Sequence, residues 1–333
     1  MSGYTLSPHY ASDNVVREPT RVGFGRGLRA AGEADERVVA LCADLTESTQ
    51  MSLFCDAYPA RFVEVGVAEQ NLVTLASGMA RVGKLPFAAS YAAFSPGRTW
   101  EQIRTTICLN ELPVKIVGAH AGVSVGPDGA THQMLEDIAL MRVLPHMIVV
   151  NPGDSLEAEK ATIALAQDDQ RPGYIRLARE KSPIFSTEHS PFAIGPAYVL
   201  HQGDDVTLLS TGPMTAQALV AGQKLREQGI GAEIIHVPTI KPLDIETIIT
   251  SVAKTGRVAT AEEAQTAAGF GGLIAETLCD HLPAPLLRIG LNDCFGESGT
   301  ADELIAHFGL DAESIARRVG EFVRSRPQYR RGY

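Results

Sequence analysis

Three stretches of the sequence decide the fold: RFVEVGVAEQN at residues 61–71, SYAAFSPGRTWEQIR at 90–104 and GAHAGVSVGPDGATHQ at 118–133. Each begins near the end of a short apolar run, and such runs are typical of buried strands. In parallel sheets, ligands bind beyond the carboxyl ends of the strands. The three stretches are therefore expected to meet in one cleft.

Short apolar runs alternate with helical stretches along most of the chain. Strands are predicted at 37–41, 85–91, 114–118, 147–151 and 173–177, with helices at about 69–82 and 96–110. Further strands are predicted at 206–209, 232–237, 257–261 and 286–289, with helices at 215–228 and from about 269. This alternation predicts an α/β protein with mainly parallel sheets that are covered on both faces.

Residues 180–200 interrupt the alternation with three prolines and several polar side chains, which is typical of a linker. We interpret the chain as two doubly wound domains, residues 15–185 and the smaller 201–333, joined by a linker at 186–200. A length of 333 residues is compatible with two domains of about 150 residues each.

The composition is that of a globular protein, with 45% hydrophobic and 20% charged residues. A formal net charge of −10 disfavours a nucleic-acid partner, because nucleic-acid binders usually present a basic face. No apolar run approaches the roughly 20 residues of a membrane span, and residues 1–20 lack a signal-peptide pattern. The five cysteines form no CxxC pair, so we interpret them as reduced thiols in or near the core of a cytoplasmic protein.

Glu69 follows the almost uncharged run VGVA and begins a predicted helix. A carboxylate in this position stabilises a helix N-terminus, which is the structural explanation. The functional alternative is a carboxyl group whose pKa is raised by apolar surroundings, so that it exchanges a proton with a bound ring. Tyr91 and Phe94 likewise either pack in the core or present a flat wall to a heteroaromatic ring.

His120, Asp128 and His132 lie in a stretch that also contains four glycines. Because glycines let the backbone approach a ligand, the pattern favours a ligand-binding loop over a surface loop with incidental histidines. The spacing matches no compact zinc pattern and no cysteine joins it, so metal binding is disfavoured.

Taken together, these segments resemble the pyrimidine-binding domain of transketolase, a thiamine-diphosphate enzyme. The resemblance starts at Thr20-Arg21 and runs through ADLTES (43–48), GVAEQN, SYAAF, GPDGATHQ and IRLARE (175–180). It resumes at EEAQTAAGFGGLIAETL (262–278) and FGESGTADELIAHFGL (295–310), which are similar to the C-terminal domain of the same family. The match covers nearly the whole chain after about residue 15.

The resemblance implies roles for individual residues. Glu69 matches the glutamate that hydrogen-bonds the aminopyrimidine ring and promotes loss of the cofactor's C2 proton, and His120 and His132 match groups that move protons. Tyr91 and Phe94 match the aromatic residues that hold the pyrimidine ring, and Asp44 matches an aspartate near the cofactor. The expected contacts to the hydroxyls and phosphate of a sugar phosphate are Arg21, Ser48, His120, Asp128, His132 and Arg179.

Full-length transketolases also carry a domain with a Gly-Asp-Gly…Asn motif, and this sequence contains neither that motif nor a P-loop. The GxGxG glycines at 23, 25 and 27 follow no strand, so we interpret them as the start of a helix. The resemblance therefore implies the C-terminal half of a split transketolase. An N-terminal subunit would hold the diphosphate and Mg²⁺ or another divalent cation, and no metal site is expected here. We expect a heterotetramer with a dimer of this chain at its centre, inactive without its partner.

The expected reaction moves a two-carbon ketol unit from a ketose phosphate to an aldose phosphate, as in pentose phosphate metabolism. One alternative is a deoxyxylulose-phosphate synthase-like enzyme, which shares the AEQ and DGxTHQ patterns, although the loop length and His120 favour transketolase. A second is the β subunit of a 2-oxoacid dehydrogenase, which the GPDGATHQ loop disfavours. A third is a non-catalytic regulatory subunit, although such a chain would be expected to lose Glu69 or the histidines. Pro127 and Ala130 depart from the family pattern, so the donor and acceptor sugars stay open.

Overall fold

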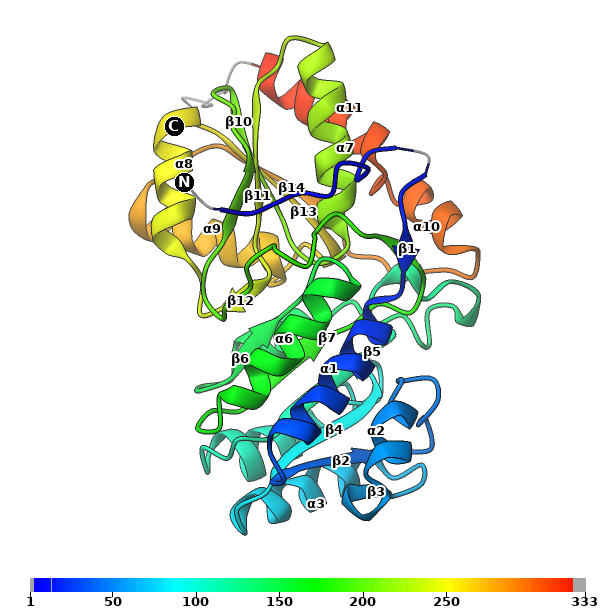
Figure 1. The fold of residues 1–333 in the computed structure, drawn as a ribbon. Coiled ribbons are helices and arrows are strands. Elements are labelled where there is room, and N and C mark those ends of the chain that lie inside the picture. The colour runs from blue at the N-terminus through cyan, green and yellow to red at the C-terminus, as the bar shows by residue number, and fades with distance from the viewer. Residues whose placement is uncertain (1–2, 13, 326–333) are drawn as a thin grey trace.

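The computed structural model describes residues 3–12 and 14–325. They form two α/β units stacked along the long axis of the molecule, each built on a mainly parallel sheet (Figure 1). The predicted fold class is confirmed.

The sheet of the first unit has seven strands in the order β12-β6-β7-β5-β4-β2-β3. These are β2 (Val38–Cys42), β3 (Phe62–Glu64), β4 (Leu85–Tyr91), β5 (Lys115–Ala119), β6 (Ile148–Val150), β7 (Gly173–Arg176) and β12 (Thr239–Lys241). All neighbouring strands are parallel except β12, which runs antiparallel to β6. The carboxyl ends of the parallel strands therefore lie along one edge.

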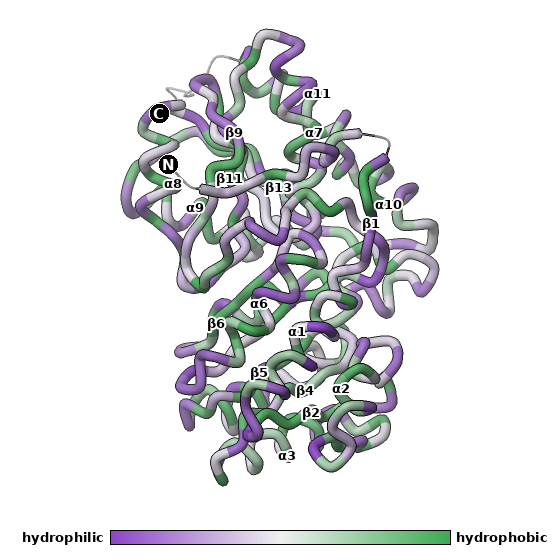
Figure 2. The backbone as a smooth tube through the Cα atoms, viewed as in Figure 1, coloured by the Kyte–Doolittle hydropathy of each residue, from purple (hydrophilic) through white to green (hydrophobic). Residues whose placement is uncertain are grey.

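Successive side chains of a strand point to opposite faces of the sheet. In β2, Val38 belongs to the core beneath α1 (Thr20–Ala34) and α6 (Ser155–Gln167), whereas Val39 belongs to the core beneath α3 (Glu69–Arg81). Because both faces are covered, the strands are almost continuously hydrophobic (Figure 2).

The GxGxG glycines lie inside α1 and allow close packing, in agreement with the helix predicted there. A Cβ on Gly27 would lie 2.6 Å from the carbonyl oxygen of Glu159 in α6, and one on Gly25 would lie 2.6 Å from that of Gln50. Glycine in a helix costs about 1 kcal/mol relative to alanine. The close approach of α6 at Gly27 and of the loop at Gln50 at Gly25 explains why these positions hold glycine.

The second sheet has five strands in the order β14-β13-β10-β11-β9, of which only β9 is antiparallel to its neighbour. The strands are β9 (Tyr198–His201), β10 (Val206–Ser210), β11 (Ala232–His236), β13 (Val258–Gln265) and β14 (Leu286–Leu291). Helices α7 (Met214–Glu227) and α11 (Ala312–Arg324) cover one face, and α8 (Ile245–Thr255) and α9 (Phe270–His281) cover the other (Figure 1).

The remaining elements are short. They are β1 (Arg17–Glu18), α2 (Ser52–Ala57), η1 (Pro59–Arg61), α4 (Trp100–Gln102), η2 (Ile103–Cys108), η3 (Val123–Asp128), α5 (Asp137–Arg142), β8 (Ser182–Pro183) and α10 (Ala301–His307). Two of them, β1 and β8, pair as a separate two-stranded antiparallel sheet.

In the described ranges, no helix is long and apolar enough to cross a bilayer.

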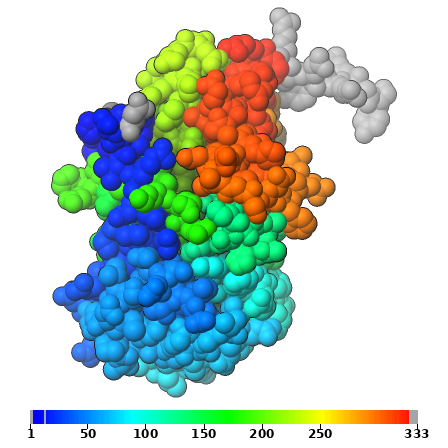
Figure 3. Space-filling view, turned by 90° about the vertical axis from the view of Figure 1, so that its right-hand side faces the viewer, coloured from blue at the N-terminus to red at the C-terminus, as the bar shows by residue number. Residues whose placement is uncertain are grey.

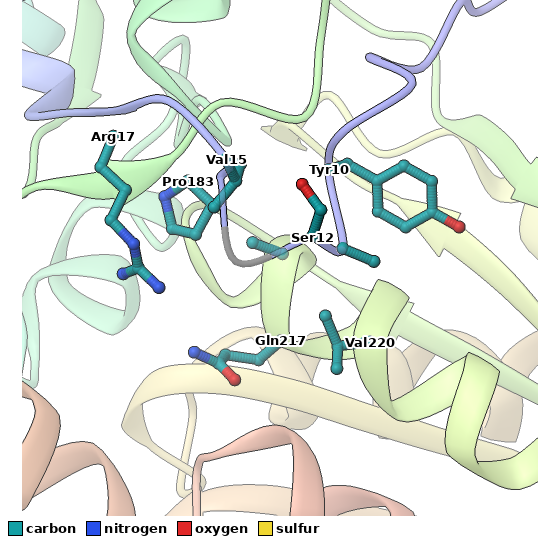
Figure 4. A pocket seen from close by; sticks show the side chains of 9 residues that line it. Tyr10, Ser12, Val15, Arg17, Pro183, Gln217 and Val220 are labelled. Atoms are coloured by element: carbon teal, nitrogen blue, oxygen red, sulfur yellow. The ribbon is translucent and has the colours of Figure 1, made fainter.

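The two units are tied together more closely than a division at a linker implies. Strand β9 begins inside the stretch 186–200, and β12 lies beyond it in sequence yet extends the first sheet. The N-terminal segment crosses the second unit, where the Tyr10 hydroxyl lies 2.8 Å from Nε2 of His201 (Figure 1). Between this segment and α7 is a cavity of about 310 Å³ lined in part by Arg17 and Gln217 (Figure 4).

Two local predictions were wrong in part. The helix predicted at 96–110 begins only at Trp100, because residues 92–99 form turns, and it runs directly from α4 into the π-helix η2. Of the cysteines, Cys279 and Cys294 are exposed rather than in or near the core, although all five are free. Spacing alone does not tell which face of a helix or loop a thiol occupies.

Candidate functional site

The predicted site residues follow five neighbouring parallel strands, β7, β5, β4, β2 and β3, at their carboxyl ends. In that order of strands, Arg179, His120, Tyr91, Asp44 and Glu69 each lie at or shortly after the strand end. Parallel pairing of neighbouring strands therefore brings together residues that are spread between positions 44 and 179 of the chain.

Glu69 is the first residue of α3 and is only 3% exposed. Its Oε2 lies 2.7 Å from Nη1 of Arg98, whose side chain is half exposed. The guanidinium carbon of Arg98 also lies 5.1 Å from the centre of the Phe94 ring. One guanidinium therefore contacts both the carboxylate and the aromatic wall. The surroundings of Glu69 are only partly apolar, because the charged side chain of Arg98 lies against its carboxylate. Arg98 is 29 residues further along the chain.

Four rings form an aromatic cluster: Tyr91, Phe94, His120 and His132. The Tyr91 ring stacks on His120 with centroids 3.8 Å apart and on Phe94 with centroids 5.9 Å apart, both at 24°. The His132 ring meets Phe94 edge-on at 5.4 Å and 73°. Stacked and edge-on arrangements are those that aromatic rings prefer. The cluster combines a flat apolar wall with two imidazoles that can exchange protons.

His120 occupies an unusual position at the end of β5. Its backbone has a φ of +56°, a conformation that L residues adopt rarely, and it is only 2% exposed. Burial, together with the nearby charges of Arg21, Arg179 and His132, lowers the pKa of its imidazole to about 3. Among the described residues, none lies within hydrogen-bond distance of its buried Nδ1. His120 is therefore a neutral imidazole with a free ring nitrogen.

The residues predicted to bind phosphate also lie together. Arg21 donates to the carbonyl oxygens of Ser48 at 2.7 Å and Arg179 at 3.2 Å. Arg179 in turn donates to the carbonyl oxygen of Val125 at 2.7 Å and lies 3.4 Å from Oδ1 of Asp128. Burial and the neighbouring Arg179 lower the pKa of Arg21. Two guanidiniums beside one aspartate can bind a phosphate together with a hydroxyl.

Glu64 is a site residue that the sequence reasoning missed. Its Oε1 accepts hydrogen bonds from the backbone N–H groups of Asp44 at 2.7 Å and Gly66 at 2.8 Å. Its Oε2 accepts one from the Thr46 hydroxyl at 3.0 Å. Glu64 thus ties the loop that carries Asp44 to the loop that leads into Glu69. The only signal in the sequence is an acidic residue at the end of an apolar run, two residues before a glycine.

Near Glu69 and Arg98 the surface opens into a cavity of about 560 Å³. A buried carboxyl group beside an aromatic wall suits a heteroaromatic ring that carries both donors and acceptors. Within residues 3–12 and 14–325, no group of three or more His, Cys, Asp or Glu side chains is arranged to hold a metal ion.

These features define a two-domain α/β protein with a candidate ligand site at the carboxyl edge of its first sheet. The family model "Transketolase, pyrimidine binding domain" matches residues 18–183, and "Transketolase, C-terminal domain" matches residues 195–315. The chain belongs to the transketolase family and contains these two domains. The pyrimidine-binding domain implies the use of thiamine diphosphate, and the side chains on this edge fit its aminopyrimidine ring.

Several relatives carry the same two domains. A putative transketolase C-terminal section from Methanocaldococcus jannaschii is 44% identical over 92% of this chain and 96% of its own length. A 6-deoxy-6-sulfo-D-fructose transketolase subunit from a Clostridium species is 41% identical over 90% of this chain and 92% of the subunit. A 1-deoxy-D-xylulose-5-phosphate synthase from a Synechococcus species is 37% identical over 89% of this chain, but over only 46% of the synthase.

Among solved structures, a split-gene transketolase, described as an inactive β4 tetramer, superposes with a TM-score of 0.85. It is 41% identical in sequence, and the match covers 92% of this chain and 98% of that one. The chain is therefore similar to subunits of split transketolases in both sequence and fold.

Proposed function

We propose that this chain is one subunit of a transketolase that moves a two-carbon ketol unit from a ketose phosphate to an aldose phosphate. The observation that carries the proposal is the position of Arg98, which contacts Glu69 and Phe94 together. The carboxylate is thereby held beside the aromatic cluster, as a ring-binding site requires.

Thiamine diphosphate, when bound, supplies the carbanion chemistry of the reaction. Glu69 would hold a ring nitrogen through a hydrogen bond, while Tyr91 and Phe94 would orient the ring against their faces. Arg98 contacts Oε2 of Glu69, so the ring would be held through the other carboxyl oxygen, Oε1.

The substrate groups would be bound on the other side of the aromatic cluster. Arg21 and Arg179 would hold the phosphate through charge-assisted hydrogen bonds, and Asp128 would accept one from a sugar hydroxyl. His120, uncharged and with a free Nδ1, is suited to accept a hydrogen bond from a substrate hydroxyl, and His132 would be the second imidazole that contacts the substrate.

We further propose that a partner subunit binds the diphosphate through Mg²⁺, that two copies of each chain form a heterotetramer, and that the assembly is cytoplasmic. The description of the split-gene relative as an inactive β4 tetramer supports partner dependence. The different sugars named for the relatives leave the donor to be identified by experiment.

The test uses this chain with a candidate partner, thiamine diphosphate and Mg²⁺. Ketose phosphates, a 6-sulfo ketose and pyruvate are supplied as donors, and products are identified by mass spectrometry. The proposal predicts ketol transfer from a ketose phosphate only when both chains are present. Turnover by this chain alone would contradict the split arrangement, and use of pyruvate with release of carbon dioxide would indicate a synthase instead.

Replacing Glu69 distinguishes a carboxyl group that acts on the cofactor from one that only stabilises the N-terminus of its helix. Glu69→Ala should slow C2-proton exchange of the bound cofactor by about 10²–10⁴-fold, the usual size of a general acid–base contribution. Glu246→Ala is the matched control, since Glu246 is an exposed carboxylate in the first turn of α8. If both variants lose only a little stability and exchange is unchanged, Glu69 merely stabilises its helix.

A further inference from the structure

Strand β13 contains two adjacent glutamates that are both buried, Glu262 and Glu263. Adjacent side chains of a strand point in opposite directions. Glu262 points into its own unit and accepts hydrogen bonds at 2.7 Å from the backbone N–H groups of Phe270 and Gly271, at the start of α9. Glu263 points toward the first unit. The two carboxylates therefore bind different parts of the protein: Glu262 holds the start of α9, and Glu263 faces the first unit.

Glu263 contacts the loop that carries the predicted histidines, which we call the histidine loop (residues 120–132). Its Oε1 accepts a hydrogen bond from the backbone N–H of Ser124 at 2.5 Å. A Cβ on Gly122 would lie 2.5 Å from the carboxyl carbon of Glu263, so the backbone of the loop passes directly against the carboxylate. Arg176, which donates to the Glu263 carbonyl oxygen at 2.8 Å, supplies a buried positive charge beside it.

The second unit also contacts this part of the chain through the segment before α10. The Gln133 side chain donates to the carbonyl oxygen of Glu297 at 2.8 Å. A Cβ on Gly129 would lie 2.6 Å from the Ser298 hydroxyl, which shows how closely the two segments approach. In Figure 3 the orange segment of the second unit rests on the teal segment of the first. The histidine loop is thus held between the units.

The conformation of His120 makes this support important. A residue other than glycine with a positive φ persists only where its surroundings hold it. The Glu263–Ser124 hydrogen bond lies four residues after His120, in the same loop, and comes from the other domain. Ala121 and Gly122 are also held by backbone hydrogen bonds to Leu177 and Met134 of the first unit. The bond from Glu263 adds the support of the second unit two residues further on, and its loss would weaken the hold on the loop that keeps the imidazole against Tyr91.

We propose that Glu263 is a positioning residue through which the C-terminal domain holds the histidine loop, and with it His120, in the geometry that the reaction needs. The kinetic consequence rests on the proposed function, whereas the effect on the loop follows from the contacts alone. The proposal gives the C-terminal domain a part in the site although none of the predicted site residues belongs to it.

Hydrogen–deuterium exchange of the full chain tests the effect on the loop. Glu263→Ala and Glu263→Asp, which removes one methylene of reach, should raise exchange of the Ser124 amide and its neighbours by about tenfold or more, because the hydrogen bond that protects Ser124 is lost. Glu263→Gln keeps an acceptor oxygen and should restore most of the protection. Glu262→Ala is the matched control on the same strand, and it should loosen the start of α9 while leaving the loop protected.

Unchanged exchange of the loop in both Glu263→Ala and Glu263→Asp, with the chain still folded by circular dichroism, would overturn the proposal. Equal loosening by Glu262→Ala would overturn it too, because the effect would then be one of general stability. If Glu263→Ala does not fold, the comparison of the Asp and Gln variants decides the question.

The kinetic arm uses the assembled enzyme with its partner and Mg²⁺. Glu263→Asp should lower kcat by about 10–100-fold, as misplaced catalytic groups do, with a smaller change in KM. Glu263→Gln should recover most of kcat, and Glu262→Ala should keep it. A change confined to KM would contradict a role through His120. If the wild-type assembly transfers no ketol unit, the proposed function fails, while the exchange experiment still decides whether Glu263 holds the loop.

Discussion

His120 is predicted to stay uncharged in the folded chain at pH 5, where an ordinary histidine carries a proton. Its pKa is lowered from 6.5 to about 3, chiefly by burial and then by the charges of Arg21, Arg179 and His132. The prediction is tested by changing the pH, and the His120→Gln variant serves as the reference because it lacks the imidazole.

The sign follows from the direction of the pKa change. Between pH 3 and 6.5 the unfolded chain binds a proton at His120 that the folded chain excludes, so the free energy of unfolding falls as pH falls. A difference of one in pKa corresponds to about 1.4 kcal/mol. Lowering the pH from 7.5 to 5 should therefore cost about 2 kcal/mol through His120 alone, because the unfolded histidine titrates near 6.5.

Two measurements check this prediction. In ¹⁵N-histidine NMR spectra, the signal that disappears in His120→Gln should keep the shifts of a neutral ring down to pH 5. In urea unfolding at the two pH values, His120→Gln should lose about 2 kcal/mol less than the wild type. The exposed His189→Gln controls for removing a histidine as such. A His120 signal that titrates near pH 6.5, or equal losses in the wild type and His120→Gln, would refute the reasoning.

Three further predictions concern the phosphate site, helix packing and the buried ion pair. Arg179→Ala should raise KM for phosphorylated substrates by about 10–100-fold and leave unphosphorylated analogues nearly unaffected, since a charged hydrogen bond contributes about 1.5–3 kcal/mol. Gly27→Ala should destabilise the chain by about 1–3 kcal/mol by overpacking α1 against α6, whereas Gly78→Ala, with open space around it, should be stabilising; chemical denaturation compares them. Asp137→Asn should cost about 3–5 kcal/mol by leaving the buried Arg176 without its carboxylate, and a small loss in thermal unfolding would contradict this.

Much of the fold follows from local patterns. The apolar runs at 85–91 and 206–209 become β4 and β10, because a strand buried on both faces has to be hydrophobic along its whole length. The helix that begins at Glu69 follows from the spacing of its apolar residues. By contrast, β12 has only three residues and pairs with a strand of the other unit, so no local pattern marks it.

The sequence by itself determined most of the strands, several of the main helices and, through its motifs, which residues are candidates for the site. Their order along the chain was enough to predict that the strand ends would share one edge, because parallel strands with helical connections arrange them so. Only the tertiary structure decided which side chains meet there. Arg98 reaches Glu69 from 29 residues away and Glu263 reaches Ser124 from 139 residues away. Such contacts depend on how the two units pack, and the periodicity of a single element carries no information about that packing.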